Sequence, residues 1–215
     1  MSTVQVDTIN ESTTGSGVTV DGVLIKDGQV DGVDVSTLSV DTNGLVKLSS
    51  ATASASSELV FDNFVDTSTY TNYKIIYEFI KAATDTAELR LTFRTGGASG
   101  SDITGTYRRQ NNYSNLTTTS MSRHTLSTTD YAQLYQMGNA DREELSAISY
   151  FYPSNGTNGM PYTITETVLR YPDGNNYANT TYNLYGTATN TTGIKFFMSS
   201  GNITSGSIHI YGVKK

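Results

Sequence analysis

The sequence contains no cysteine and no tryptophan, and its 215 residues include only three prolines and two histidines. Without cysteine the chain forms neither disulfides nor Cys-ligated zinc sites, and it has no thiol nucleophile. Charged residues make up 16% of the chain, against about 25% in an average soluble protein, and acidic residues outnumber basic ones. The formal net charge of −6 argues against nucleic acid as the main partner, because phosphate binding needs a basic face.

Long apolar runs are also missing. No stretch approaches the roughly 20 residues needed to span a membrane. The first residues, Met-Ser-Thr-Val-Gln-Val-Asp, lack the basic and apolar regions of a secretory signal. We therefore expect synthesis in a cytoplasm and no membrane insertion.

What the sequence has in abundance is tyrosine, with 15 residues, together with threonine, serine, asparagine and the β-branched valine and isoleucine. β-branched and aromatic residues favour strands, and small polar residues favour turns. The composition therefore predicts an all-β protein.

Aromatic residues divide the chain in two, because residues 1–50 contain none and they recur every few residues after Ser57. Between these parts, residues 51–57 form a tract of small residues typical of a linker. We predict an N-terminal anchoring arm at residues 1–14 and a Gly/Asp/Val-rich stem at residues 15–50. A β-sandwich head then occupies residues 58–215.

The stem alternates Asp-Gly and Asn-Gly turn signals with apolar strings of three or four residues. Such strings bury too little apolar surface to offset their own ordering entropy. We expect them to be buried between chains, in an intertwined homotrimer; the alternative is that the stem folds back onto its own head. The predicted interface residues are Val18, Val20, Val23, Ile25, Val33 and Val35.

Three stretches carry a resemblance to a known group of proteins. The run from Asp7 to Gly28, DTINESTTGSGVTVDGVLIKDG, resembles a phrase at the root of tail fibres and spikes in marine tailed phages. Residues 201–213 are similar to the last strand pair of β-sandwich domains in such proteins, and residues 61–64 with 70–76 are similar to the first. The resemblance implies a virion protein, assembled in the host cytoplasm, whose arm contacts other virion structural proteins.

In the head the apolar residues alternate with polar ones at a period of two, as in half-buried strands. Leu89, Leu91 and Phe93 are the clearest example, and residues 73–81 are apolar on both faces, typical of a central strand covered on both sides. About ten short strands separated by Gly/Asn turns predict an antiparallel, jelly-roll-like sandwich. The expected strands are 58–64, 73–81, 89–94, 105–113, 131–137, 145–152, 162–171, 180–188, 194–198 and 207–213.

Residues suited to catalysis are scarce. His209 alternates with two isoleucines and should lie on an exposed strand face, whereas His124 falls in a Ser/Thr tract, 117–129, that reads as a loop. No Gly-x-Ser-x-Gly elbow accompanies either histidine. Glu166 alternates in phase with Ile164 and Val168, which hints at an inward position, but a bulge within 162–171 could turn it outward, and a solvated or edge-strand glutamate is the favoured interpretation. We predict no enzyme, no cofactor and no metal site.

Two segments rich in tyrosine and amides are the best candidates for binding a polar ligand. They are residues 107–113 and 171–177, interpreted as loops although 105–113 is also a weak strand candidate, and the first also carries two adjacent arginines suited to acidic sugars. The alternative is that both are solvated turns with tyrosines packed on the sandwich rim. The candidate ligand-binding residues are Tyr107, Arg108, Arg109, Asn112, Tyr113, Asn175, Asn176 and Tyr177.

These features favour a trimeric tail fibre or spike that mediates adsorption to the host surface, with a glycan or an outer-membrane component as its ligand. The second hypothesis is a structural protein that decorates the capsid or completes the tail. A small glycan hydrolase is a distant third, because glycan cleavage needs two carboxylates about 5–10 Å apart across a sugar site.

Overall fold

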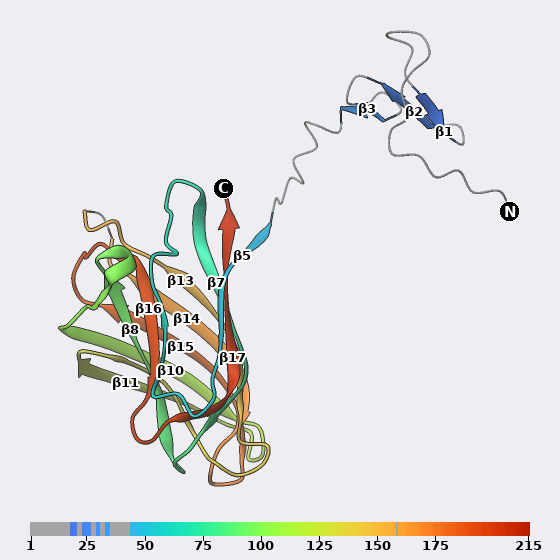
Figure 1. The fold of residues 1–215 in the computed structure, drawn as a ribbon. Coiled ribbons are helices and arrows are strands. Elements are labelled where there is room, and N and C mark those ends of the chain that lie inside the picture. The colour runs from blue at the N-terminus through green and yellow to red at the C-terminus, as the bar shows by residue number, and fades with distance from the viewer. Residues whose placement is uncertain (1–17, 21–22, 27–28, 31–32, 35–43, 158) are drawn as a thin grey trace, which may run out of the picture. The chain divides into compact units, whose positions relative to one another are not determined.

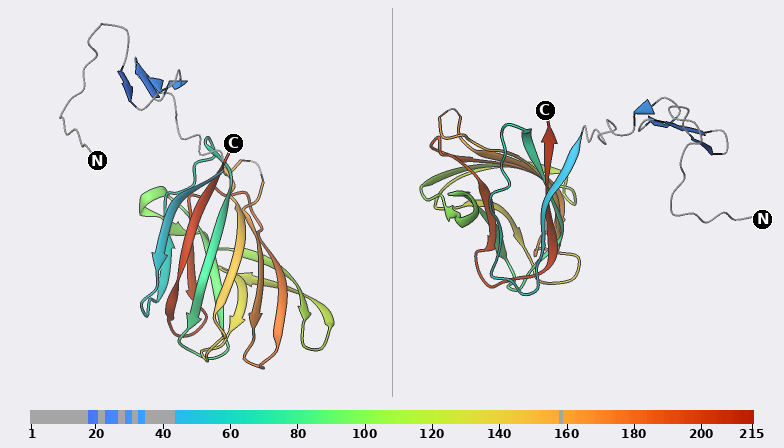
Figure 2. Two further views of the ribbon diagram at one scale, coloured as in Figure 1. Left: turned by 90° about the vertical axis from the view of Figure 1, so that its right-hand side faces the viewer. Right: turned by 45° about the horizontal axis from the view of Figure 1, so that its top comes forward.

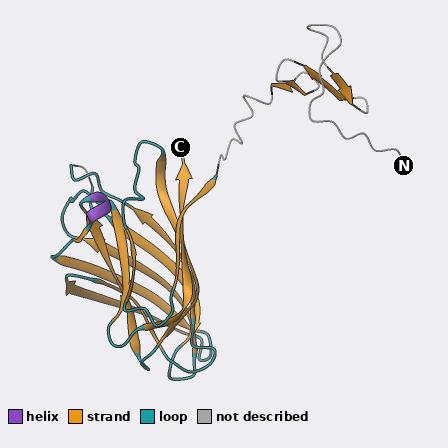
Figure 3. Ribbon diagram, viewed as in Figure 1, coloured by secondary structure: helices purple, strands orange, loops and turns teal. Residues whose placement is uncertain are grey.

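The computed structural model describes residues 18–20, 23–26, 29–30, 33–34, 44–157 and 159–215. The chain divides into two compact units, residues 1–43 and 44–215, which are treated separately below. Nearly all described regular structure is β-strand, with one short 3₁₀ helix (Figure 3). The predicted all-β class is therefore confirmed.

The first unit contains a sheet of four short antiparallel strands in the order β1 (Val18–Val20), β2 (Val23–Lys26), β3 (Gln29–Val30) and β4 (Val33–Asp34). Each strand pairs with the next along the chain, for example Val20 with Val23. These strands hold Val18, Val20, Val23, Ile25 and Val33 of the predicted trimer interface. Val35 and the arm at 1–14 lie outside the described residues, and the trimer stays a prediction.

The second unit consists of two antiparallel sheets packed face to face, as Figure 1 and both views of Figure 2 show. The large sheet has the strand order β11-β10-β15-β14-β13-β7-β17-β5, and the small sheet has the order β12-β8-β16-β6 with β9 beside β8. The elements are β5 (Leu45–Thr52), β6 (Glu58–Phe61), β7 (Tyr70–Ala82), β8 (Ala87–Thr95), the 3₁₀ helix η1 (Gly97–Ser99), β9 (Ser101–Asp102), β10 (Thr106–Asn115), β11 (Ser120–Thr129), β12 (Ala132–Met137), β13 (Leu145–Tyr152), β14 (Tyr162–Arg170), β15 (Asn176–Tyr185), β16 (Gly193–Met198) and β17 (Ile203–Lys214).

The sandwich begins earlier in the chain than predicted. Residues 45–50 were expected in the stem and 51–57 in a linker, but β5 is an edge strand of the large sheet and pairs with β17 from Leu45 opposite Val213 to Thr52 opposite Ser207. The small side chains that resemble a linker are also compatible with an edge strand, whose stability comes from its backbone pairing with a neighbour. The boundary between the two units lies at residue 43.

The apolar core lies between the two sheets. The alternation predicted for β8 is confirmed, since Leu89, Leu91 and Phe93 are fully buried. Aromatic rings link the sheets: Phe93 of β8 stacks on Phe151 of β13 with ring centroids 5.3 Å apart, and Phe196 of β16 packs edge-on against Tyr77 of β7 at 5.4 Å. Such ring pairs stabilise the core beyond the area they bury.

Strand β7 departs from the prediction at its end. Phe79 has a positive φ of 50° and is 70% exposed, so the alternation shifts there and Ile80 points into the core. The bulge is matched by Gly206 on β17, where an added Cβ would lie 2.5 Å from the carbonyl oxygen of Phe79. A bulge inserts one residue and reverses the faces beyond it, which strict alternation cannot anticipate. Only the inner face of β7 is fully buried, since Ile76 on the other face is half-buried.

Candidate functional site

The first predicted binding segment, 107–113, is part of β10, a strand near the free edge of the large sheet, so the strand candidate at 105–113 is confirmed and the loop interpretation is wrong. Because successive side chains of a strand point to opposite faces, Arg108 lies on the outer face of the sheet and Arg109 lies between the two sheets. The guanidinium groups of the two adjacent arginines therefore lie on opposite faces of the large sheet. Tyr107 is 1% exposed, accepts a hydrogen bond from the backbone N–H of Phe93 (3.1 Å) and is part of the core.

The second segment, 171–177, forms the turn between β14 and β15. Asp173 organises it, since its Oδ1 accepts the backbone N–H of Asn175 (2.9 Å) and its Oδ2 accepts the hydroxyl of Tyr177 (2.8 Å). The side chain of Asn175 donates to Asp173 as well (3.2 Å), and Asn176 is exposed at the start of β15. Asn175 thus supports the turn and is not free for a ligand.

The structure brings parts of the two segments together, because β10 and β15 are neighbours in the large sheet. The ring of Tyr177 lies 5.9 Å from that of Tyr113 and 4.6 Å from that of Tyr171. These three tyrosines contribute to a pocket between the sheets, whereas Arg108 and Asn112 face outward. The predicted residues are therefore divided between two concave sites, one on each face of β10.

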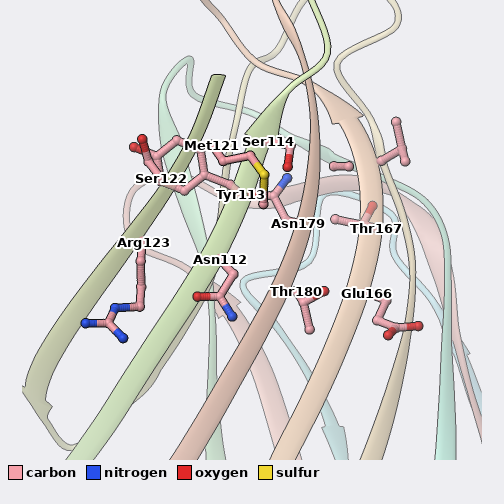
Figure 4. Close-up of a pocket in the computed structure, with 12 residues that line it drawn as sticks. Asn112, Tyr113, Ser114, Met121, Ser122, Arg123, Glu166, Thr167, Asn179 and Thr180 are labelled. Carbon is pink, nitrogen blue, oxygen red and sulfur yellow. The ribbon is translucent and has the colours of Figure 1, made fainter. Parts of the chain in front are cut away.

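The first site, here called the outer groove, crosses β14, β15, β10 and β11 on the face turned away from the small sheet (Figure 4). Cross-strand pairing aligns Glu166 beside Thr180, Thr180 beside Asn112, and Asn112 beside Arg123. A carboxylate, a hydroxyl, an amide and a guanidinium therefore follow one another across four strands. Since neighbouring strands are about 4.8 Å apart, this row extends over about 14 Å.

The ends of this row have no partners within the described residues. Neither Glu166 nor Arg123 forms an ion pair or a side-chain hydrogen bond in that part of the chain, and about 14 Å is too far for them to pair with each other. Apolar side chains flank the row, with Met121 83% exposed and Val168 62% exposed. The outer groove thus combines unpaired polar groups with exposed apolar surface.

The second site, here called the inter-sheet pocket, has a volume of about 260 Å³. Arg109 lies at this pocket and bridges the sheets: one Nη donates to Oε1 of Gln133 (3.2 Å) and the other to the backbone carbonyl of Leu134 (3.1 Å), both on β12. Burial lowers the pKa of Arg109. The lining residues are Glu88, Arg109, Asn111, Tyr113, His124, Gln133, Gln136, Tyr171 and Tyr177.

The solvated position favoured for Glu166 is confirmed, without a bulge in the pairing of β14. The buried residues of β14 are Thr163, Thr165, Thr167 and Leu169, while Glu166 is exposed together with Val168. Threonine is β-branched and polar, so it fits either face of a strand. The hydroxyl of Thr165 is hydrogen-bonded to that of Ser149 (2.6 Å), and the hydroxyl of Thr167 donates to the backbone carbonyl of Ser146 (2.6 Å).

The two histidines also differ from expectation. His124 lies on β11, the exposed edge strand, rather than in a loop, and it lines the inter-sheet pocket. His209 is half-buried, and its Nε2 lies 3.1 Å from Oε2 of Glu78. Neither histidine is hydrogen-bonded to a serine or threonine hydroxyl in the described part of the chain.

Among the described residues, no group of three or more histidine, aspartate or glutamate side chains lies close enough together to hold a metal ion. Nor do they include a helix that is long and apolar enough to cross a membrane.

Sequence reasoning missed Glu166, Thr180 and Arg123 as binding candidates because each lies on a different strand. Only the register of β14, β15, β10 and β11 places them in one row. The comparisons with known proteins add no relative: no protein-family model matches the chain, and neither a curated protein nor a solved structure matches it.

Proposed function

We propose that the protein is a structural virion protein of a tailed phage and that its sandwich adsorbs the particle to a glycan on the host surface. The residues of the first unit, in this proposal, join three copies and attach them to other virion proteins. The support for the virion assignment is the resemblance of residues 7–28 and of the two ends of the head to phage appendage proteins.

The observation that carries the binding role is the outer groove. Its row of Glu166, Thr180, Asn112 and Arg123 offers both donors and acceptors, which suits the hydroxyl groups of a sugar chain. Val168 and Met121 beside the row offer apolar surface against which sugar rings can pack. An extended groove across four strands accommodates a linear polymer better than a compact ligand.

A second candidate is a capsid-decorating or tail-completing role without receptor binding. It is favoured by exposed apolar side chains on the outer face of the large sheet, where Ile148 and Tyr150 are each 37% exposed and Tyr182 is 42% exposed. Exposed apolar residues grouped on one face are typical of protein–protein contacts.

The test is binding of the full-length protein to an array of bacterial surface polysaccharides. We expect the parent to bind a subset of them and the double variant Asn112→Ala/Arg123→Ala to bind at least about thirtyfold more weakly, because anchors of this kind carry about 2 kcal/mol or more. The matched control is Lys47→Ala, which removes one exposed cation from β5 at the opposite edge of the same sheet.

Equal binding by the double variant and the parent would remove the outer groove from the site. Binding to phage capsids, with no polysaccharide bound, would favour the decorating role instead.

A further inference from the structure

Arg109 is a cation that lies between two sheets. Its two hydrogen-bond acceptors, the side-chain amide of Gln133 and the backbone carbonyl of Leu134, are both neutral, and its Nε is buried without a partner. The carboxylate that lines the same pocket, Glu88, is already paired with Arg90 at 2.8 Å. In the described part of the chain no carboxylate forms an ion pair with Arg109.

An uncompensated charge in a largely buried position is unfavourable, because water no longer solvates it fully. A guanidinium has five N–H donors, so the two hydrogen bonds of Arg109 leave three donors unused. A planar carboxylate fits such a fork with two parallel hydrogen bonds and supplies the missing charge. The electrostatics of the inter-sheet pocket therefore favour an anionic ligand.

The walls of the pocket are suited to a small polar ring. Tyr113, Tyr171 and Tyr177 provide aromatic surface, and the hydroxyls of Tyr113 and Tyr171 have no hydrogen-bond partner among the described residues. A volume of about 260 Å³ is below the range of about 300–1,000 Å³ found for drug-sized ligands, so it suits one ring rather than a longer oligomer.

We propose that the inter-sheet pocket binds a small sugar acid of the uronic class, with its carboxylate on Arg109 and its ring between Tyr113, Tyr171 and Tyr177. A carboxylate matches this site better than a phosphate because the pocket contributes one unpaired cation, which balances one negative charge. Hydroxyl groups on the sugar ring form hydrogen bonds with the hydroxyls of Tyr113 and Tyr171.

The inter-sheet pocket lies on the other face of β10 from the outer groove, and Tyr113 lines both. Arg109 and Arg108 are consecutive on β10, but the guanidinium of Arg109 is hydrogen-bonded to β12 between the sheets, whereas Arg108 is exposed and does not line the pocket. Arg108 therefore provides a control that matches Arg109 in charge, size and strand.

The experiment is isothermal titration calorimetry of the full-length protein with glucuronate, glucose, acetate and inorganic phosphate. We expect glucuronate to bind at least about tenfold more tightly than the other three, because only it combines the charge with the ring. Arg109→Met should weaken glucuronate binding at least about tenfold, and Arg108→Met should leave it unchanged. No binding of glucuronate by the parent, or equal binding by Arg109→Met, overturns the proposal.

The remaining arms test each part of the assignment. Acetate binding as tightly as glucuronate would contradict the role of the tyrosine walls, and phosphate binding more tightly than glucuronate would contradict the carboxylate. Without ligand, Arg109→Met should unfold at the same temperature as the parent or a higher one, since an unpaired buried charge has been removed. A clearly lower unfolding temperature of Arg109→Met, together with no heat of glucuronate binding to the parent protein, would mean that Arg109 only bridges the two sheets structurally.

If Arg109→Met does not fold, Tyr113→Ala tests the same site. It should weaken glucuronate binding about tenfold and leave the weak binding of acetate unchanged, because it removes a wall and keeps the cation. Unchanged glucuronate binding by Tyr113→Ala would overturn the proposal.

Discussion

The two halves of the large sheet present different chemistry to the small sheet. The inner faces of β7 and β17 are apolar and include Ile75, Tyr77, Ile208 and Ile210, all with 0–1% exposure. The inner faces of β14, β15 and β10 carry threonine and asparagine at positions that are just as deeply buried. These are Thr163, Thr165, Thr167, Asn111, Asn179, Thr181 and Asn183.

The two halves of the large sheet therefore contribute differently to the stability of the fold. The apolar half contributes the hydrophobic free energy, whereas the polar half gains little from burial and must satisfy its own donors and acceptors. It does so in part through a ladder of side chains, in which Thr181 donates to Oδ1 of Asn111 (3.0 Å) and Asn111 contacts Asn179 (3.4 Å). Both concave sites lie on the polar half.

The strongest test of this comparison is Phe196→Ala, which truncates a fully buried ring of the small sheet packed on Tyr77 and Phe61. The cavity should lower the free energy of unfolding by about 3–5 kcal/mol. Urea denaturation followed by circular dichroism measures this. A loss below about 1 kcal/mol would show that the apolar half is not the main source of stability.

High pH compares one tyrosine from each half. Burial raises the pKa of Tyr73 on β7 to about 12, and burial likewise raises the pKa of Tyr171 beside the inter-sheet pocket to about 12. The unfolded chain loses these protons near pH 10, so the stabilising contribution is complete below pH 10 and is lost between about pH 10 and 12. Urea midpoints across this range should fall as the near-UV absorbance of tyrosinate rises.

The same titration distinguishes the two tyrosines. The nearby Arg109 cation lowers the pKa of Tyr171, so Arg109→Met should raise that pKa further and leave Tyr73 unchanged. An equal change in the pKa of Tyr171 and of Tyr73 in Arg109→Met would contradict the placement of Arg109 in the polar half alone.

Within the polar half, Thr165→Val should destabilise the protein by about 1 kcal/mol. Its hydroxyl shares a 2.6 Å hydrogen bond with Ser149, which in turn bonds to Tyr77 (3.0 Å), and the substitution leaves the shape of the side chain almost unchanged. Chemical denaturation measures the change. Stability equal to the parent's would mean that this network contributes nothing.

The smallest expected effect is an increase in the free energy of unfolding rather than a decrease. Thr163 lies on the same face of β14, is fully buried, and its hydroxyl has no partner among the described residues. Thr163→Val should therefore stabilise the protein by up to about 1 kcal/mol, since it removes an unsatisfied polar group. A loss of stability would indicate that the hydroxyl is hydrogen-bonded in solution by a buried water.

The sequence predicted the inner faces of apolar strands better than those of polar strands, for a physical reason. Leu89, Leu91 and Phe93 alternate with polar residues, and only burial of the apolar set is favourable, so the pattern specifies the inner face. On β14 both faces carry residues compatible with a strand. The apolar alternation favours burial of the face that carries Ile164, whereas in the structure the face that carries the threonines is buried. The inner face there depends on hydrogen bonds to other strands, which no local pattern contains.

The candidate sites were predictable only in part. Tyrosine and asparagine enrichment in 107–113 and 171–177 singled out Tyr113 and Tyr177, which both line the inter-sheet pocket. The row from Glu166 to Arg123 depends on the pairing of four strands, and the separation of Arg108 from Arg109 depends on recognising β10 as a strand. Polar residues lower the strand signal, so a polar strand resembles a loop in sequence.

The position of β5 has a mechanical consequence. This strand follows directly after residue 43, and its first residue, Leu45, lies opposite Val213 near the C-terminal end of β17. A pull on residue 44 along the axis of β5 would slide that strand past β17, so the hydrogen bonds between them would bear the load together rather than breaking one after another. Tension entering at this edge would then reach the outer groove, which starts at β14, only after crossing β17, β7 and β13.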